Sequence, residues 1–413
     1  MALDHVSAQI EAYENNPLAV PHPRPHRLFH SNLRCDARRS GHPAPRPHAG
    51  VQPALADRAH PGADRRFHAG PGPTHADVLP TPIPAPLPWA NLNLTGKLIF
   101  LTFITAPQSA PILVQLDLAT GQQTTLFQPP TNTWVSGAAV SPDHAQIVIA
   151  YAPPPPPGEY QFGYTELYVM PADGSEAPGP LLQLTQKPEA FFNPVWSPDG
   201  KYVYYVHLTP DSSDQQTFQY RLERMAYPAG KPEVISDHAA WPRLSPDGTK
   251  LAYVAFDPPN SVNDLYFADP DGKNARPVMP LKTFQSVDAP FFSPDGSFIY
   301  FSATGDGLAP ALVEDPLQGA ARPSEWGWLD GLFGARTAYA NGAPSDWWRI
   351  PVAGGPPQRL THIFDTGLYG AFSPDGAHIA FIALTGLYVM NPDGSALTQM
   401  LNVANVGTVD WIP

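Results

Sequence analysis

The chain has 413 residues and a formal net charge of −13; 54 residues are proline and one, Cys35, is cysteine. So many prolines exclude a mainly helical protein, because a proline inside a helix breaks it. The single cysteine excludes an internal disulfide and a thiolate metal site. Residues 91–413 hold 15 basic and 30 acidic residues, a net charge of −15. So acidic a body repels phosphate backbones, and nucleic acid is not an expected partner.

Residues 1–90 contain nine of the 14 histidines and 16 of the prolines. With few aliphatic residues, this segment cannot bury enough surface to offset its ordering entropy, so we predict that it is disordered. Its histidines lie irregularly among prolines, which argues against the metal binding of some His-rich tracts. The N-terminus lacks the basic-then-apolar pattern of a secretory signal, and no run of about 18 apolar residues follows, so we expect no membrane span.

The rest of the chain carries a short repeat. Ser-Pro-Asp recurs five times with spacings of 56, 48, 48 and 80 residues, at 141–143, 197–199, 245–247, 293–295 and 373–375. Proline presets the first corner of a tight turn, and the Asp side chain bonds its own backbone. Each copy therefore predicts a turn between two strands. A spacing of 48 residues is typical of a four-stranded propeller blade, which needs roughly 40–50.

Each predicted turn belongs to the same series of strands. A short apolar strand precedes the turn, and a strand rich in β-branched and aromatic residues follows it. A third strand and a second tight turn come next, and a fourth strand ends the series. In chain order, the third strands and their turns occupy 166–174, 264–272, 346–355 and 386–394.

The two ends of the repeat region complete each other. Residues 96–103, 112–121 and 124–127 match a second, third and fourth strand, and residues 407–413 match a first strand with no turn after it. We therefore predict an all-β, six-bladed β-propeller over residues 91–413, closed by pairing of the C-terminal strand with the N-terminal strands. A closed ring leaves no sheet edge for another chain, so we expect a monomer.

This repeat resembles that of the TolB-like six-bladed propellers with WD40-like repeats. The resemblance lies in SPDG before an aliphatic and aromatic strand, LYVM before a PDG turn, and a QLT-like fourth strand. It covers residues 91–413 and implies the fold. TolB-like propellers are commonly extracytoplasmic in bacteria, which would apply to this chain if its N-terminus is incomplete. The compartment therefore stays open.

The strand order predicts which face of the ring carries long loops. The SPDG turns and the second tight turns lie on one face, the turn face. Loops between second and third strands, and connectors between blades, lie on the opposite face, the connector face. Three insertions fall there: 152–165, 207–217 and 304–345. Binding sites tend to lie on variable loops of a rigid scaffold, so we predict that the connector face is functional.

The longest insertion contains an aromatic segment, SEWGWLDGLFG. Exposed tryptophans serve as binding anchors, so we predict a partner-binding patch there. Its members are Trp326, Trp328, Leu329, Leu332 and Phe333. Alternatively, these side chains fold back onto their own blade beside Trp347 and Trp348.

Acids and histidines in the connectors form a second candidate site at the channel mouth. They are Glu189, Asp237, His238, Asp288, His362 and Asp365. Convergent side chains of these types can hold a cation or a basic peptide. Alternatively, they are solvated loop charges and turn-forming side chains.

These observations favour a non-catalytic binding or scaffold propeller for a protein or peptide partner. No phosphate-binding glycine loop, nucleophile elbow or zinc-binding helix occurs, so we predict no catalytic residue, metal or cofactor. Two alternatives remain: a metal-assisted lyase or hydrolase at the channel mouth, and a small-molecule sensor. Whether the chain is an enzyme is therefore left open.

Overall fold

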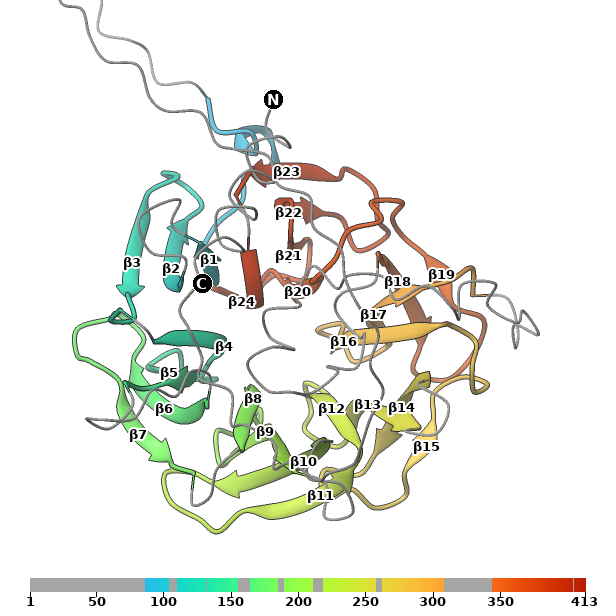
Figure 1. The fold of residues 1–413 in the computed structure, drawn as a ribbon. Helices are drawn as coiled ribbons and strands as arrows, with labels where there is room; N and C mark the ends of the chain where they lie inside the picture. Colours follow the sequence, from blue (N-terminus) through green and yellow to red (C-terminus); the bar gives the residue numbers. More distant parts are fainter. Residues whose placement is uncertain are drawn as a thin grey trace, which may run out of the picture. The chain divides into compact units, whose positions relative to one another are not determined.

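The fold is taken from a computed structural model. It describes residues 86–103, 110–131, 133–154, 164–184, 189–210, 218–257, 262–307, 344–403 and 405–413. Within these residues, 24 strands form six four-stranded antiparallel sheets arranged as the blades of a ring (Figure 1). The predicted six-bladed β-propeller is confirmed. Most of residues 1–90, predicted to be disordered, lies outside the described residues.

The first three blades follow the chain, and the strand nearest the channel is given first. Blade 1 contains β24 (Asn405–Ile412), β1 (Lys97–Phe103), β2 (Pro111–Asp117) and β3 (Gln123–Phe127). Blade 2 contains β4 (Trp134–Val140), β5 (Gln146–Ala152), β6 (Glu166–Pro171) and β7 (Gly179–Leu182). Blade 3 contains β8 (Ala190–Trp196), β9 (Tyr202–Pro210), β10 (Phe218–Ala226) and β11 (Glu233–Asp237).

The other three blades have the same strand order. Blade 4 contains β12 (Ala239–Leu244), β13 (Leu251–Asp257), β14 (Val262–Ala268) and β15 (Arg276–Pro277). Blade 5 contains β16 (Ser286–Phe292), β17 (Phe298–Thr304), β18 (Asp346–Pro351) and β19 (Gln358–Arg359). Blade 6 contains β20 (Tyr369–Phe372), β21 (Ile379–Ala383), β22 (Gly386–Met390) and β23 (Thr398–Leu401).

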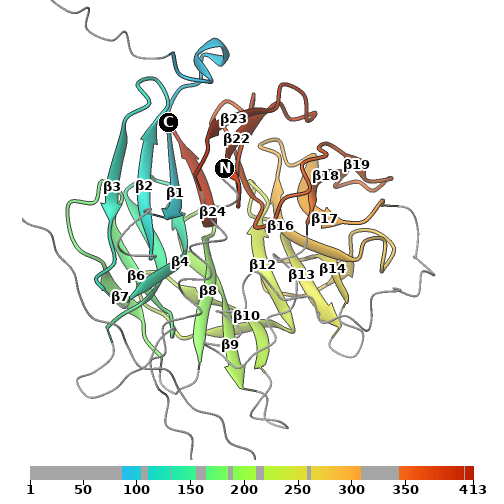
Figure 2. The same ribbon diagram turned by 45° about the horizontal axis from the view of Figure 1, so that its top comes forward.

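The C-terminal strand closes the ring. β24 pairs antiparallel with β1, with Ile412 opposite Lys97 and Trp411 opposite Leu98 (Figures 1 and 2). The predicted closure is therefore confirmed. The packed body also begins before residue 91. Trp89 is 2% exposed, its indole N–H donates to the Leu118 carbonyl at 2.8 Å, and a short 3-10 helix (Ala90–Leu92) follows it.

Hydrophobic clusters fill the spaces between neighbouring blades. Strand β1 shows how: Leu98 and Phe100 pack toward blade 6, whereas Ile99 and Leu101 pack toward blade 2. Successive side chains of a strand point to opposite faces, so a strand between two neighbours is apolar at nearly every position. Burying each such side chain contributes about 1.5–3 kcal/mol. Adjacent blades thus hold one another in a fixed orientation.

The SPDG turns share one set of hydrogen bonds. At 197–202, the Ser197 hydroxyl donates to Asp199 at 2.7 Å and accepts the Tyr202 N–H at 2.9 Å. The Asp199 carboxylate also accepts the Lys201 N–H at 3.1 Å. The other four copies repeat this pattern. The serine is buried in every copy, so its hydroxyl replaces water for backbone groups at the strand ends.

Five of the six innermost strands carry a β-bulge, in β4, β8, β12, β16 and β24. In three of them a residue before proline takes a positive φ: Asn193 (45°), Trp241 (51°) and Ala289 (45°). Positive φ is uncommon for residues other than glycine. A bulge redirects the side chains of its strand, and these three residues line the channel.

Candidate functional site

The connector face carries the long loops of the chain. The loops that join second and third strands lie there, including the three insertions found in the sequence. Residues 155–163, 211–217 and 308–343 of these insertions lie outside the described residues. The predicted aromatic patch, Trp326, Trp328, Leu329, Leu332 and Phe333, belongs to the last of these segments. Its role therefore stays a prediction.

A buried aspartate organises the connector beside the longest insertion. Asp346 is 2% exposed and accepts hydrogen bonds from the Thr361 hydroxyl at 3.1 Å and the Ile363 N–H at 2.6 Å. Its carboxylate also binds the guanidinium of Arg359. The Phe364 N–H adds a longer bond of 3.4 Å. The carboxylate thus holds residues 361–364 in one conformation.

The hydrogen bonds to Asp346 hold Phe364 at the surface. Its side chain is 62% exposed, the largest fraction among the described large hydrophobic residues. Its φ is 47°, a conformation that tertiary contacts must impose on a residue other than glycine. The Arg359 guanidinium lies 5.0 Å from the ring centroid, within the range of a cation–π interaction. The next residue, Asp365, bridges to Ser345 at the end of the insertion.

Two of the predicted channel-mouth residues belong to a charged cluster on blade 3. Glu189 lies 3.4 Å from one ring nitrogen of His207, and Glu223 lies 3.0 Å from the other. Arg221 lies 3.7 Å from Glu223 and donates to Asp237 at 3.2 Å. Two carboxylates therefore flank the imidazole ring of His207.

The other predicted channel-mouth residues are dispersed. His362 is exposed, and His238 is half-buried with a φ of 53°. Asp365 accepts the backbone N–H groups of Thr366 and Thr385, at 2.7 and 3.2 Å, as turn-forming aspartates do. Within the described part of the chain, no three His, Cys, Asp or Glu side chains are grouped closely enough to hold a metal ion.

Asp288 lies buried on the innermost strand of blade 5. Its side chain is 1% exposed, and neither carboxylate oxygen has a hydrogen-bond partner among the described residues. Burial raises the pKa of this carboxyl well above its ordinary value, and the Ser286 hydroxyl lowers it only in part. A buried carboxylate without a partner is costly in its charged form, which favours the protonated acid.

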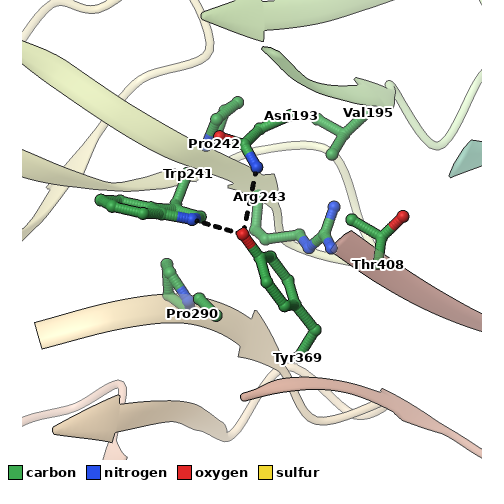
Figure 3. A pocket seen from close by; sticks show the side chains of 9 residues that line it. Asn193, Val195, Trp241, Pro242, Arg243, Pro290, Tyr369 and Thr408 are labelled. Atoms are coloured by element: carbon green, nitrogen blue, oxygen red, sulfur yellow. Dashed lines mark hydrogen bonds between the residues drawn. The ribbon is translucent and has the colours of Figure 1, made fainter. Parts of the chain in front are cut away.

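The channel is closed by side chains from three blades. The Tyr369 hydroxyl accepts the Trp241 indole N–H at 3.1 Å and an Asn193 amide N–H at 3.4 Å (Figure 3). The three residues come from β20, β12 and β8. The cavity between them is about 10 Å³, roughly the room that one water molecule needs. This cavity by itself therefore has no space for a metabolite.

Two oppositely charged residues, Arg243 and Asp410, lie on innermost strands of the ring. They come from β12 and β24, in blades 4 and 1, and Figure 3 shows the guanidinium extended toward Thr408 on β24. Both keep some accessible surface, and Arg243 lines the cavity. Burial lowers the pKa of Arg243 and raises the pKa of Asp410, and each charge partly offsets the shift of the other.

Our sequence reasoning missed this channel set, although a signal was present. Asn193, Trp241, Ala289 and Tyr369 each precede the serine of an SPDG turn by four residues. All four line the cavity. It also missed His207 and Glu223, because the pairing of β9 with β10 is needed to bring them together. Among the described residues, no helix is long and apolar enough to cross a membrane.

No family model matches the chain. A curated protein of Bacillus subtilis, the uncharacterized peptidase YuxL, is 28% identical over 197 residues. That match covers 46% of this chain and 29% of YuxL, so the chain spans less than a third of that relative's length.

Solved structures show a wider likeness. TolB from Acinetobacter baumannii matches with a TM-score of 0.51 and 15% identity, over 77% of this chain and 67% of that one. A putative TolB from Agrobacterium tumefaciens matches with a TM-score of 0.50 and 16% identity, over 78% of this chain and all of that one. At such identities the likeness concerns the fold: the chain forms a TolB-like six-bladed β-propeller.

Proposed function

We propose that this protein is a non-catalytic binding propeller that recognises a protein or peptide partner on its connector face. The display of Phe364 carries the proposal. A large aromatic side chain is held exposed by a buried carboxylate, in a backbone conformation that costs energy. Preorganised aromatic anchors supply much of the affinity of protein interfaces, because little entropy is lost when they are buried by a partner.

The surroundings of Phe364 support this role. The connector that carries it is joined to the end of the longest insertion by hydrogen bonds of 2.9 and 3.2 Å between the backbones of Ser345 and Asp365. The predicted partner-binding residues of 324–334 belong to that insertion. The net charge of −15 over residues 91–413 favours a basic partner.

The closed channel also supports recognition at the surface. Side chains of Trp241 and Tyr369 meet across it and leave a cavity of about 10 Å³. A partner therefore engages the rim and its loops. In this proposal the insertion and Phe364 act together as one patch, and the ring serves to hold them in a fixed orientation.

Affinity capture with the full chain tests the proposal. Capture from an extract of the source cells is quantified by mass spectrometry for the wild type, for Phe364→Ala, and for a chain with residues 308–343 replaced by a short Gly-Ser linker. Leu397→Ala is the matched control, because Leu397 is 41% exposed but follows a turn-face turn. We expect one specific protein to be retained by the wild type and the control, and to fall at least roughly tenfold in the other two, as hot-spot truncations do. Equal retention by all four chains would contradict the proposal.

A further inference from the structure

The guanidinium of Arg243 lies in the channel without a direct partner. No hydrogen bond, and no ion pair within 4.0 Å, joins it to another residue in the part of the chain that the structure describes. A guanidinium carries five N–H donors and does not lose its charge in proteins. Its donors therefore need an acceptor in the cavity, which a water molecule or an anion can supply.

Asp410 does not fill this role directly. Its carboxylate accepts the Val140 N–H at 2.8 Å and so is held toward blade 2. It acts on Arg243 only through space, at more than ion-pair distance. The two residues come from opposite blades of the ring, and of the two only Arg243 lines the cavity.

The lining of the cavity favours a negative occupant. None of the nine residues that line it is acidic, and Arg243 is the one charged residue among them. The Asn193 amide uses one of its two N–H groups on Tyr369, which leaves the second as a donor. Val195, Ala289 and Pro290 supply an apolar wall. N–H donors beside apolar groups suit a weakly hydrated anion.

We propose that this cavity binds one small monovalent anion of halide size, held by the guanidinium of Arg243. The cavity, at about 10 Å³, admits a group of about the size of a water molecule. Oxyanions with several oxygen atoms exceed that size. The anion joins the innermost strands of blades 3, 4 and 6 around one charge, and so stabilises the ring from within.

The competing occupant is a water molecule that bridges Arg243 to Asp410. The two occupants differ in how they respond to the loss of the aspartate charge. Asp410 repels an anion at Arg243, so Asp410→Asn strengthens anion binding. A bridging water, in contrast, loses its charged acceptor in this variant, and the variant then melts lower whichever anion is present.

Thermal melting of the full chain tests the proposal at fixed ionic strength, with sodium chloride or bromide exchanged for sodium gluconate. We expect chloride to raise the Tm of the wild type by about 2–4 °C once it exceeds its dissociation constant tenfold. Asp410→Asn should reach half of the rise at a several-fold lower chloride concentration. Arg243→Met should show no anion-dependent rise.

Chloride NMR linewidths on the same three proteins give a readout that does not depend on stability. Broadening should be present in the wild type, stronger in Asp410→Asn and absent in Arg243→Met. If Arg243→Met does not fold, the comparison of wild type with Asp410→Asn still decides. Equal melting in chloride and gluconate, without broadening, would assign the cavity to water and overturn the proposal.

Discussion

The turn face repeats one set of hydrogen bonds at five positions, whereas the connector face shares fewer: a carboxylate at the start of the third strand accepts a connector N–H in blades 2, 4 and 5. The SPDG serines are all buried and make the same bonds. A second set of hydrogen bonds also recurs on the turn face. Tyr204 and Arg224 of blade 3 hold the carbonyl of Pro270, at 2.8 and 2.9 Å. Tyr300 and Arg349 of blade 5 hold that of Pro392 in the same way, at 2.9 and 3.0 Å.

On the connector face, neighbouring blades differ in the length of the loop between their second and third strands. Blade 6 joins its second and third strands through Leu384 and Thr385, whereas blade 5 inserts about forty residues at the same place. Asp346 organises one connector, and the cluster around His207 holds another. This difference indicates that hydrogen bonds repeated in several blades stabilise the scaffold. Residues that differ from blade to blade are then available for recognition. Four predictions test this division.

The largest effect is expected from removing the closing strand, on which both faces depend. Deletion of residues 407–413 removes most of the pairing with β1 and the buried Val409 and Trp411. Each large side chain contributes about 1.5–3 kcal/mol, and a whole domain has only about 5–15 kcal/mol to lose. We expect the cooperative melting transition, followed by circular dichroism, to disappear. Deletion of Pro413 alone is the control. Unchanged melting of the longer deletion would contradict ring closure by this strand.

The next effect compares one hydroxyl on each face. Ser245→Ala removes the acceptor of the Lys250 N–H and the donor to Asp247 at a buried turn. We expect the free energy of unfolding to fall by about 1–3 kcal/mol, the cost of leaving buried groups unpaired. Thr385→Ala on the connector face removes an exposed bond to Asp365 and should cost under about 1 kcal/mol. Denaturant titration measures both. Equal losses of unfolding free energy in the two variants would contradict a greater role of the turn-face hydrogen bonds in stability.

The third prediction is that Asp247 and Asp288 change the stability of the fold with pH in opposite directions. Hydrogen bonds from Ser245 and Thr249 lower the pKa of Asp247 to about 2. This turn-face aspartate therefore stabilises the fold above the unfolded pKa of about 3.9, and the contribution is lost as pH falls toward 2. Asp288 behaves in reverse. Its pKa is raised, so the native state binds the proton more tightly, and stability falls as pH rises above about 4.

Two asparagine variants separate these contributions. Asp288→Asn should raise the Tm relative to wild type at pH 8 and have its smallest effect at pH 4. Asp247→Asn should lower the Tm at pH 7, and its deficit should shrink as pH approaches 2. Melting curves between pH 2 and pH 8 give both profiles. Parallel profiles for the two variants would show that burial does not set the protonation of Asp288.

The smallest effect on stability is expected at Phe364. Phe364→Ala removes a side chain that is 62% exposed, and exposed substitutions usually change the free energy of unfolding by less than about 0.5 kcal/mol. Relief of the positive φ is not expected, because alanine is strained there as well. Denaturant titration beside Leu397→Ala measures the change. A loss above about 2 kcal/mol would place Phe364 in the scaffold and outside the recognition surface.

The sequence predicted best what depends on near neighbours in the chain. Each SPDG turn is made by bonds that span at most five residues, so its residues alone determine its geometry. The channel could not be predicted in this way. Asn193 meets Tyr369 across 176 positions, and Trp241 meets it across 128. Of the predicted channel-mouth residues, the structure places Glu189 and Asp237 in one charged cluster, whereas His362 lies apart and is exposed to solvent.

The sequence by itself determined the number of blades, the order of their strands and the closure of the ring, because strand period, turn chemistry and the complementary ends are local properties of the chain. Only the tertiary structure decided that Trp241 and Tyr369 close the channel, that Arg243 faces a cavity without an acceptor, and that Phe364 is exposed. There are two physical reasons. A β-bulge changes the direction of its side chains, and the residue types in the strand do not specify that change. In addition, strands on opposite sides of the ring meet only after all six blades are assembled.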